Sequence, residues 1–422
     1  MMTIDDFNTA LLGFLDASPT PFHATRNMAM MCENAGFIRL DETEKWTLEK
    51  GQKYFVTRND SSIIAFTYPG EDDYVMMGAH TDSPNLKLKP NPVIKKNGLT
   101  QLGVEPYGGV LLNPWFDRDL SIAGRVAYKD KDGQIKEVLV DLQKAVAIIP
   151  SLAIHLDREV NEKHAVNAQT DIVPIITSGE FDFTEWIKAA LLQEGHSDFE
   201  SLLSHELSLY DTQKAGYVGL KEDFISSARL DNLLSCYVAL LTICSVAPEQ
   251  PCLMICSDHE EVGSGSTSGA AGSFLESVLR RMTPDFEGYT RLTRKSLMVS
   301  CDNAHAVHPN FAGKHDDNHA PRINEGVVVK VNANQRYASS SRTISSFALA
   351  AERQGITLQQ FVTRSDMGCG STIGPITATR LGIDTIDVGL PTFAMHSIRE
   401  LSGSKDAHQL YRILLALSAH KG

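Results

Sequence analysis

The chain has 422 residues, of which 42% are hydrophobic and 22% are charged, and it carries a formal net charge of −13. A chain of this length is too long to fold around a single hydrophobic core, so two or three domains are predicted. The composition is that of a soluble globular protein. The negative charge argues against nucleic acids and anionic membranes as partners, and an anionic substrate would need local positive groups.

Cysteine usage and apolar segments indicate a cytoplasmic protein. The seven cysteines include no CxxC pair, which excludes zinc-ribbon and thioredoxin-like sites and favours reduced thiols. The N-terminus lacks the basic segment of a secretory signal. The longest uncharged apolar stretch, 233–247, is too short to cross a bilayer and is predicted to be a buried helix.

The first half of the chain is predicted to contain two helices within residues 1–45, the first capped by Thr3, followed by strands. A Pro/Gly/Asn-rich passage occupies about 84–118, and Lys131-Asp132-Gly133 is a hairpin signal. The strand-like segments before residue 93 are 53–58, 62–68 and 74–80. Those after it are 125–130, 135–142, 145–150 and 170–176, so residues 93–224 are predicted to be β-rich.

After residue 225, helices and apolar strands alternate, which indicates an α/β sheet covered by helices on both faces. The predicted helices are 231–247, 272–282, 343–355 and about 403–419. The predicted strands are 252–258, 296–303, 326–332, 356–362 and 385–391.

An acidic pair, Glu260 and Glu261, follows the apolar strand in the run PCLMICSDHEEVGSGS. Two adjacent carboxylates at the mouth of a buried strand are costly unless a cation partners them. One glutamate can bind a metal while its neighbour moves protons, which is the chemistry of a metal hydrolase. The alternative is a solvated acidic turn.

Further candidate metal ligands occur at or near the ends of predicted strands. His80 and Asp82 follow a strand in GAHTDSPN, and the aspartate can orient the imidazole. Asp231 precedes a helix and could instead be its N-cap. Asp302 closes a strand, and His396 lies in a loop after one. Ligands bind at this edge of open α/β sheets.

The charge of these side chains suits two divalent cations. Two divalent cations bring four positive charges, and the carboxylates of Asp231, Glu261 and Asp302 neutralise three of them. The two imidazoles are neutral, so a bridging hydroxide balances the remaining positive charge. Imidazole and carboxylate ligands without thiolate suit Zn²⁺ and also Mn²⁺ or Co²⁺. Cys301, next to Asp302, is predicted to point into the core.

The ordered motifs resemble the M18 family of metallo-aminopeptidases, the aspartyl aminopeptidases. They are SPTPFHA, GAHTDSPNLKLKP, WFDRDLSIAGRV, SARLDNL, SDHEEVGS, SCDNAHAVHPN, KVNANQRYAS, GSTIGPI and AMHSIRE. The resemblance implies an α/β metallopeptidase domain with a mixed sheet, formed by residues 1–92 and 225–422, and an inserted β-rich oligomerisation domain at 93–224.

The resemblance also implies roles for individual residues. One zinc ion, or Mn or Co, would be held by His80, Asp231 and Asp302. The second ion would be held by Glu261 and His396, with Asp231 as the bridge. Glu260 would be the general base that acts on a metal-activated bridging water, and Asp82 would steer His80.

The implied activity is removal of N-terminal Asp or Glu from peptides by a homo-oligomer, often a dodecamer built from dimers. Lys330 and His305 match family positions in the substrate pocket, with a surface lysine and a structural histidine as the alternatives. His155 would reach the active site of a neighbouring subunit, unless it only packs beside Leu152 and Leu156. Other functions on this scaffold are a carboxypeptidase, an amide deacylase, or a non-catalytic cargo-binding protein.

Overall fold

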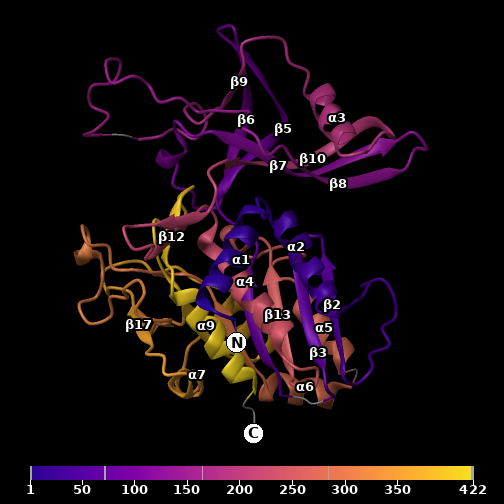
Figure 1. The fold of residues 1–422 in the computed structure, drawn as a ribbon, viewed down its shortest axis with the longest axis vertical. Helices are drawn as coiled ribbons and strands as arrows, with labels where there is room; N and C mark the ends of the chain where they lie inside the picture. Colours follow the sequence, from indigo (N-terminus) through magenta and orange to yellow (C-terminus); the bar gives the residue numbers. More distant parts are fainter. Residues whose placement is uncertain (1, 71–72, 164, 284, 420–422) are drawn as a thin grey trace. The chain divides into compact units, whose positions relative to one another are not determined.

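The computed structural model describes residues 2–70, 73–163, 165–283 and 285–419, which form two compact units (Figure 1). Unit 1 comprises Met1–Ser83, Ala215–Met395 and Glu400–Gly422, and unit 2 comprises Pro84–Lys214 and His396–Arg399. The predicted boundaries, after residues 92 and 224, lie further along the chain than these divisions. The role of the insert in oligomerisation stays a prediction.

Unit 1 is built around a mixed nine-stranded sheet in the order β1-β2-β3-β13-β4-β14-β18-β16-β17. Neighbours in the run β13-β4-β14-β18 are parallel, whereas β3 pairs antiparallel with β2 and β13. The sheet contains one strand that was not predicted, β1 (Ile38–Arg39), which lies in the segment 1–45 predicted to contain two helices. The other strands of this sheet were predicted and are confirmed. They are β2 (Gln52–Arg58), β3 (Ser62–Tyr68), β4 (Val75–His80), β13 (Cys252–Ser257), β14 (Leu297–Cys301), β16 (Val328–Val331), β17 (Gln359–Val362) and β18 (Asp384–Gly389).

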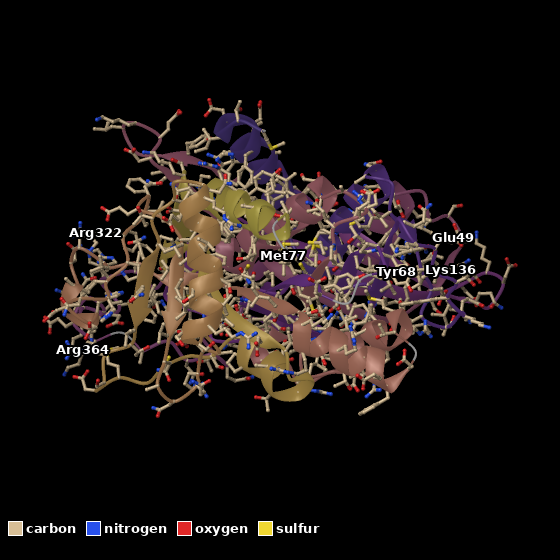
Figure 2. The ribbon with its side chains drawn as sticks, turned by 90° about the horizontal axis from the view of Figure 1, so that it is seen from below. Glu49, Tyr68, Met77, Lys136, Arg322 and Arg364 are labelled. Carbon is tan, nitrogen blue, oxygen red and sulfur yellow. The ribbon has the colours of Figure 1, made fainter. Side chains whose placement is uncertain are left out.

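Helices cover both faces of this sheet, which confirms the predicted α/β fold. Successive side chains of β4 alternate between the two faces of the sheet. Val75 and Met77 (labelled in Figure 2) belong to the core between the sheet and α1, α2, α4, α7 and α9. Met76 belongs to the core on the other face, which α5 and α6 cover. The helices are α1 (Ile4–Asp16), α2 (Pro21–Asn34), α4 (Leu230–Ser245), α5 (Phe274–Met282), α6 (Phe286–Lys295), α7 (Ser341–Arg353), α8 (Ile373–Leu381) and α9 (Asp406–Ala419).

A smaller five-stranded sheet of unit 1 has the order β11-β12-β20-β19-β15. Its strands are β11 (Gly216–Val218), β12 (Phe224–Ser227), β15 (Ala304–His305), β19 (Pro391–Phe393) and β20 (Glu400–Gly403). This sheet carries His305 in β15 and Glu400 in β20. Within the part of the chain that the structure describes, no helix has the length and apolar character needed to cross a membrane.

Unit 2 contains a six-stranded antiparallel sheet in the order β8-β7-β10-β5-β6-β9, with its own apolar core, to which the helix α3 contributes. The predicted hairpin at Lys131–Gly133 is confirmed between β7 and β8. Residues 145–150 contribute isolated bridges instead of the predicted strand. The elements are β5 (Asn85–Lys96), β6 (Leu99–Tyr107), β7 (Leu120–Asp130), β8 (Ile135–Asp141), β9 (Ile175–Thr177), α3 (Phe183–Gln193) and β10 (Phe199–Asp211).

Candidate metal centre

The candidate metal centre lies at the carboxyl ends of three neighbouring parallel strands of unit 1. His80 is the last residue of β4 and pairs in register with Ser257, the last residue of β13. Asp302 directly follows β14 on the other side of β4. Because parallel strands end at one edge of a sheet, the chain brings these side chains together from distant positions.

The imidazole of His80 is buried and held from both sides. Its Nδ1 lies 3.0 Å from the carbonyl oxygen of Asp82 and 3.4 Å from the Asp82 carboxylate. Its Nε2 lies 3.4 Å from Asp231 Oδ1 and 3.5 Å from Asp302 Oδ1. With a proton on Nδ1 donated to Asp82, the Nε2 lone pair would face two carboxylates, the arrangement that a metal-binding imidazole requires.

Asp82, which is fully buried, also fixes the acidic pair. Its two carboxylate oxygens accept hydrogen bonds from the backbone N–H groups of Glu260 and Glu261, each at 3.1 Å. These glutamates form a short 3₁₀ turn, Glu260–Val262. Asp82 therefore positions both the histidine and the glutamates, a wider role than the predicted steering of His80.

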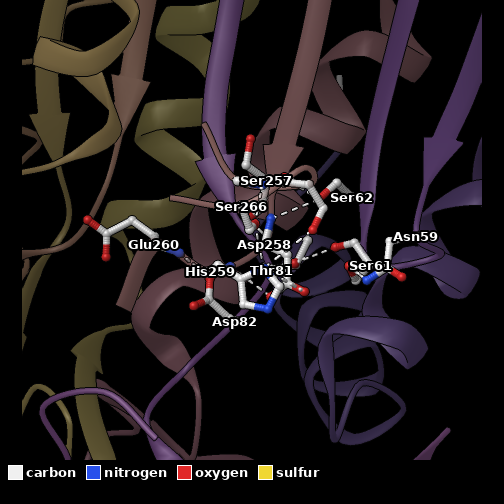
Figure 3. A network of polar contacts seen from close by, with 12 residues as sticks. Asn59, Ser61, Ser62, Thr81, Asp82, Ser257, Asp258, His259, Glu260 and Ser266 are labelled. Atoms are coloured by element: carbon white, nitrogen blue, oxygen red, sulfur yellow. Dashed lines mark hydrogen bonds and ion pairs between the residues drawn. The ribbon is translucent and has the colours of Figure 1, made fainter. Parts of the chain in front are cut away.

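A polar network supports this turn where β4 and β13 end (Figure 3). The hydroxyl of Ser62 accepts the backbone N–H of Asp258 at 2.9 Å, and His259 Nδ1 lies 2.9 Å from the Ser266 hydroxyl. Figure 3 shows the carboxylate of Glu260 extending away from this network. The backbone of the turn is thus fixed while the Glu260 side chain remains available for chemistry.

Asp231 is positioned by backbone contacts at the start of α4, where its φ and ψ are not helical. Its N–H donates to the Glu400 carboxylate at 2.9 Å, and its carbonyl oxygen accepts the Ser83 hydroxyl at 2.5 Å. Asn232, the next residue, also has non-helical φ and ψ, so the chain is kinked here and the regular part of α4 follows these two residues. The alternative interpretation of Asp231 as a residue that caps the helix stays a prediction. Sequence reasoning missed the contribution of Glu400.

The electrostatics of the cluster call for a cation. Burial, followed by the charges of Asp302 and Asp231, raises the pKa of Glu260 to about 7. Burial and Asp231 raise the pKa of Glu261 to about 10. Burial alone would lower the pKa of His80, but its contacts with three carboxylates outweigh burial and raise it well above the usual value. Gathered carboxylates hold protons in this way when no metal neutralises them.

The donor set fits divalent metal ions. Ligand atoms of His80, Asp231 and Asp302 all lie within 4.8 Å of one another, and so do those of His80, Glu260 and Glu261. The first group is the set predicted to hold one ion. The solvated-turn alternative for the acidic pair is wrong because both glutamates lie beside this buried cluster.

The remaining predicted ligand, His396, belongs to unit 2. Its Nδ1 lies 3.1 Å from the carbonyl oxygen of Gly109, and its φ is +69°, in the left-handed region. Its role as a ligand of the second ion stays a prediction.

Lys330 is buried, so the alternative of a surface lysine is wrong. Its Nζ lies 3.4 Å from Asp302 Oδ2 and 5.4 Å from the centre of the Tyr337 ring. His305 lines a cavity of about 310 Å³ together with His308, Lys314 and His315. Sequence reasoning missed these last three residues, although all lie in the polar run HPNFAGKHDDNH after the predicted strand end.

His155 is exposed in an irregular segment of unit 2. Its neighbours Leu152 and Leu156 are 62% and 74% exposed, so the alternative of a histidine packed among them is wrong for the single chain.

Comparison with known proteins identifies close relatives over almost the whole chain. Residues 14–417 match the family described as Aminopeptidase I zinc metalloprotease (M18). A protein named Probable M18 family aminopeptidase 2 from Stutzerimonas stutzeri (strain A1501) is 53% identical over 418 residues, 97% of each chain. A cryo-EM structure of an Ape4 and Nbr1 complex has a TM-score of 0.93 at 36% identity, covering 98% of this chain and 85% of that one. A structure of an S. cerevisiae mApe1 dodecamer has a TM-score of 0.85 at 28% identity, covering 99% and 97%.

Metal binding should release protons, because Glu261 is protonated in the metal-free site up to about pH 10. At pH 8, we expect zinc titration to release about one proton or more per chain. The apparent affinity should fall by about tenfold or more for each unit that the pH is lowered. Calorimetry in two buffers of different ionisation enthalpy measures this release. A binding heat that is independent of the buffer would contradict the prediction, and Glu261→Gln should release about one proton fewer.

Proposed function

The chain belongs to the M18 family of zinc metallo-aminopeptidases, and we propose that it prefers peptides whose N-terminal residue is Asp or Glu. The observation that carries the catalytic part of the proposal is the convergence of His80, Asp231, Asp302, Glu260 and Glu261 at one sheet edge. A metallo-aminopeptidase needs such a set because a metal centre and a separate proton carrier must act on the same peptide bond.

In this proposal two divalent ions occupy the centre, Zn²⁺ first and Mn²⁺ or Co²⁺ as alternatives. His80, Asp231 and Asp302 hold one ion, and Asp231, Glu261 and His396 hold the other. When bound, the ions supply Lewis-acid polarisation of the scissile carbonyl and make a water acidic near neutral pH. The close grouping of the first three residues supports the first assignment.

Glu260 is proposed as the general base. Its raised pKa, about 7 in the metal-free chain, shows how strongly its surroundings favour a proton on the carboxylate. In the reaction Glu260 would take a proton from the attacking water and give it to the leaving amine. Asp82 would keep the glutamate in place through the Glu260 N–H.

We expect Glu260→Gln to keep its zinc and lose at least about 10²-fold in kcat, because the amide preserves shape and removes basicity. Metal analysis and kinetics on one preparation measure both quantities. Glu260→Asp, which retains a carboxylate, should lose less activity than the amide. A near-normal rate for Glu260→Gln, or loss of its metal, would refute the assigned role.

Acid selectivity is proposed to come from Lys330 and His305. Lys330 places a buried ammonium group beside Asp302, and His305 lines the neighbouring cavity, which also contains Lys314. A substrate carboxylate that leaves water needs such a cation. In a chain with a net charge of −13, local positive groups have to supply this attraction.

We expect Lys330→Ala to depress kcat/KM for N-terminal Asp and Glu more than for neutral residues, because it leaves the substrate carboxylate without a cation. The measurement compares aminoacyl substrates of both kinds, and zinc content is checked because Lys330 contacts Asp302. An equal fall for all substrates, with zinc retained, would show that Lys330 has no part in selectivity.

The enzyme is also proposed to act as a homo-oligomer, a dodecamer built from dimers, in the cytoplasm. The dodecameric assembly of the mApe1 relative supports the oligomer. The seven free cysteines support a reducing compartment. His155, with exposed Leu152 and Leu156 beside it, is suited to contact a neighbouring subunit. There it could donate a hydrogen bond to the developing oxyanion.

Mixing two inactive variants, His155→Ala and Glu260→Gln, should restore activity under conditions that exchange subunits. A mixed pair would contain one site with an intact Glu260 and a His155 from its partner, and that oxyanion contact is worth about 10²-fold. The matched control mixes each variant with itself. No recovery, with exchange demonstrated by mass spectrometry, would show that His155 does not act across subunits.

A further inference from the structure

Unit 1 contains a second, larger cavity at the sheet edge opposite to the metal centre. The cavity has a volume of about 630 Å³ and is lined by Leu297 and Asp384, the first residues of β14 and β18. Asp302 of the metal centre follows the other end of β14. Five residues of β14, at about 3.3 Å each, place the two sites on the order of 16 Å apart.

One face of α7 forms a long wall of this cavity. Arg342, Ser346, Leu349, Ala350 and Arg353 all line it, and their spacing of three and four residues puts them on one side of a helix. From the first to the last arginine the helix rises by roughly 16 Å. The remaining walls come from the end of α6, from α9 and from the first residues of β14 and β18. The cavity is therefore an elongated groove.

The groove is locally positive in a negatively charged protein. Its described lining carries four basic residues, Arg294, Lys295, Arg342 and Arg353, against two acidic ones, Asp73 and Asp384. Asp384 lies 3.3 Å from Arg294 and 3.7 Å from Arg342, so one carboxylate is shared between two guanidinium groups. The lining keeps a surplus of two positive charges, whereas the whole chain has a net charge of −13.

An exposed apolar side chain lies between the two arginines of α7. Leu349 is 49% exposed, and Ser346 shares this stretch of the lining, whereas Leu297, Ala416 and Leu417 are buried. A wall with an arginine at each end and an exposed leucine between them is complementary to a chain that carries carboxylates on both sides of an apolar side chain. Such a chain presents carboxylates about 16 Å apart, which an extended peptide spans in about five residues.

We propose that this groove binds an extended acidic peptide segment of a partner protein, with an apolar side chain on Leu349 and carboxylates at Arg342 and Arg353. Arginine suits this task because its planar guanidinium group binds a carboxylate through two parallel hydrogen bonds. The segment binds away from the metal centre, so it is held without being hydrolysed. The groove would thereby recruit a partner to the enzyme independently of turnover.

The experiment is fluorescence anisotropy with the full-length, zinc-loaded enzyme. The probe is a labelled peptide with glutamates on both sides of a central leucine, acetylated at its N-terminus so that it offers no free amine for hydrolysis. We expect saturable binding that weakens with added salt. The double variant Arg342→Gln/Arg353→Gln should weaken it by at least tenfold, while kcat on an ordinary substrate stays within about twofold.

Two controls match these changes. Arg322→Gln removes an arginine that is exposed to a similar degree and pairs with Glu325 at 3.6 Å, so it should leave peptide binding unchanged. A probe with lysine in place of glutamate should not bind. Thermal unfolding of each variant confirms that it is folded.

Each of three results would overturn the proposal. The first is equal weakening by Arg322→Gln, which would show nonspecific charge attraction. The second is displacement of the probe by an unlabelled peptide with a free N-terminal glutamate but not by an acetylated one, which would place the probe in the metal centre. The third is absence of binding together with a changed oligomeric state in the double variant, which would show that a second copy of this chain fills the groove.

Discussion

The structure of unit 1 depends on one constraint, which is that several carboxylates are held close together around the buried imidazole of His80. Asp82, Asp231, Asp302, Glu260 and Glu261 surround one imidazole, and the raised pKa values of the two glutamates express the cost of this arrangement. Burial of charge is tolerated in proteins only when hydrogen bonds and counter-ions compensate it. The backbone contacts at Asp82 and Asp231 supply part of that compensation. Because the family is one of zinc metalloproteases, bound metal cations would compensate the remaining negative charge.

Asp82 links the parts of this cluster because it accepts hydrogen bonds from two consecutive backbone N–H groups and also faces His80. Both oxygens of its carboxylate are therefore engaged by the turn that presents the acidic pair. A side chain with one acceptor oxygen cannot serve both N–H groups in this way. The placement of Glu260, the proposed general base, and of His80, a proposed metal ligand, thus depends on Asp82, a buried residue that has no direct part in the proposed reaction.

The sequence predicted the strands of the central sheet well, because β3, β4, β13 and β14 are continuous apolar runs that end in polar residues. It did not predict β5, which contains Pro90 and Pro92, residues that normally exclude a strand; a register shift between Leu88 and Val93 accommodates both. The site residues at strand ends were found because their residue types suit metals. Glu400 was missed because only folding brings its carboxylate to the backbone N–H of Asp231. Lys314 was missed because only folding brings it into the cavity that His305 lines.

The order of strands in the sheet differs from their order in the chain, since β13 lies between β3 and β4 although more than 170 residues separate it from β4 along the chain. While the protein is synthesised, β3 and β4 cannot pair with β13, their shared neighbour, until Pro84–Lys214 of unit 2 and the segment up to β13 have left the ribosome. Contacts of such long sequence separation form slowly and leave strand edges exposed to aggregation. Early folding of unit 2 would shorten the effective loop between β4 and β13, so the insert can act during biosynthesis as a spacer that brings the two halves of the sheet together.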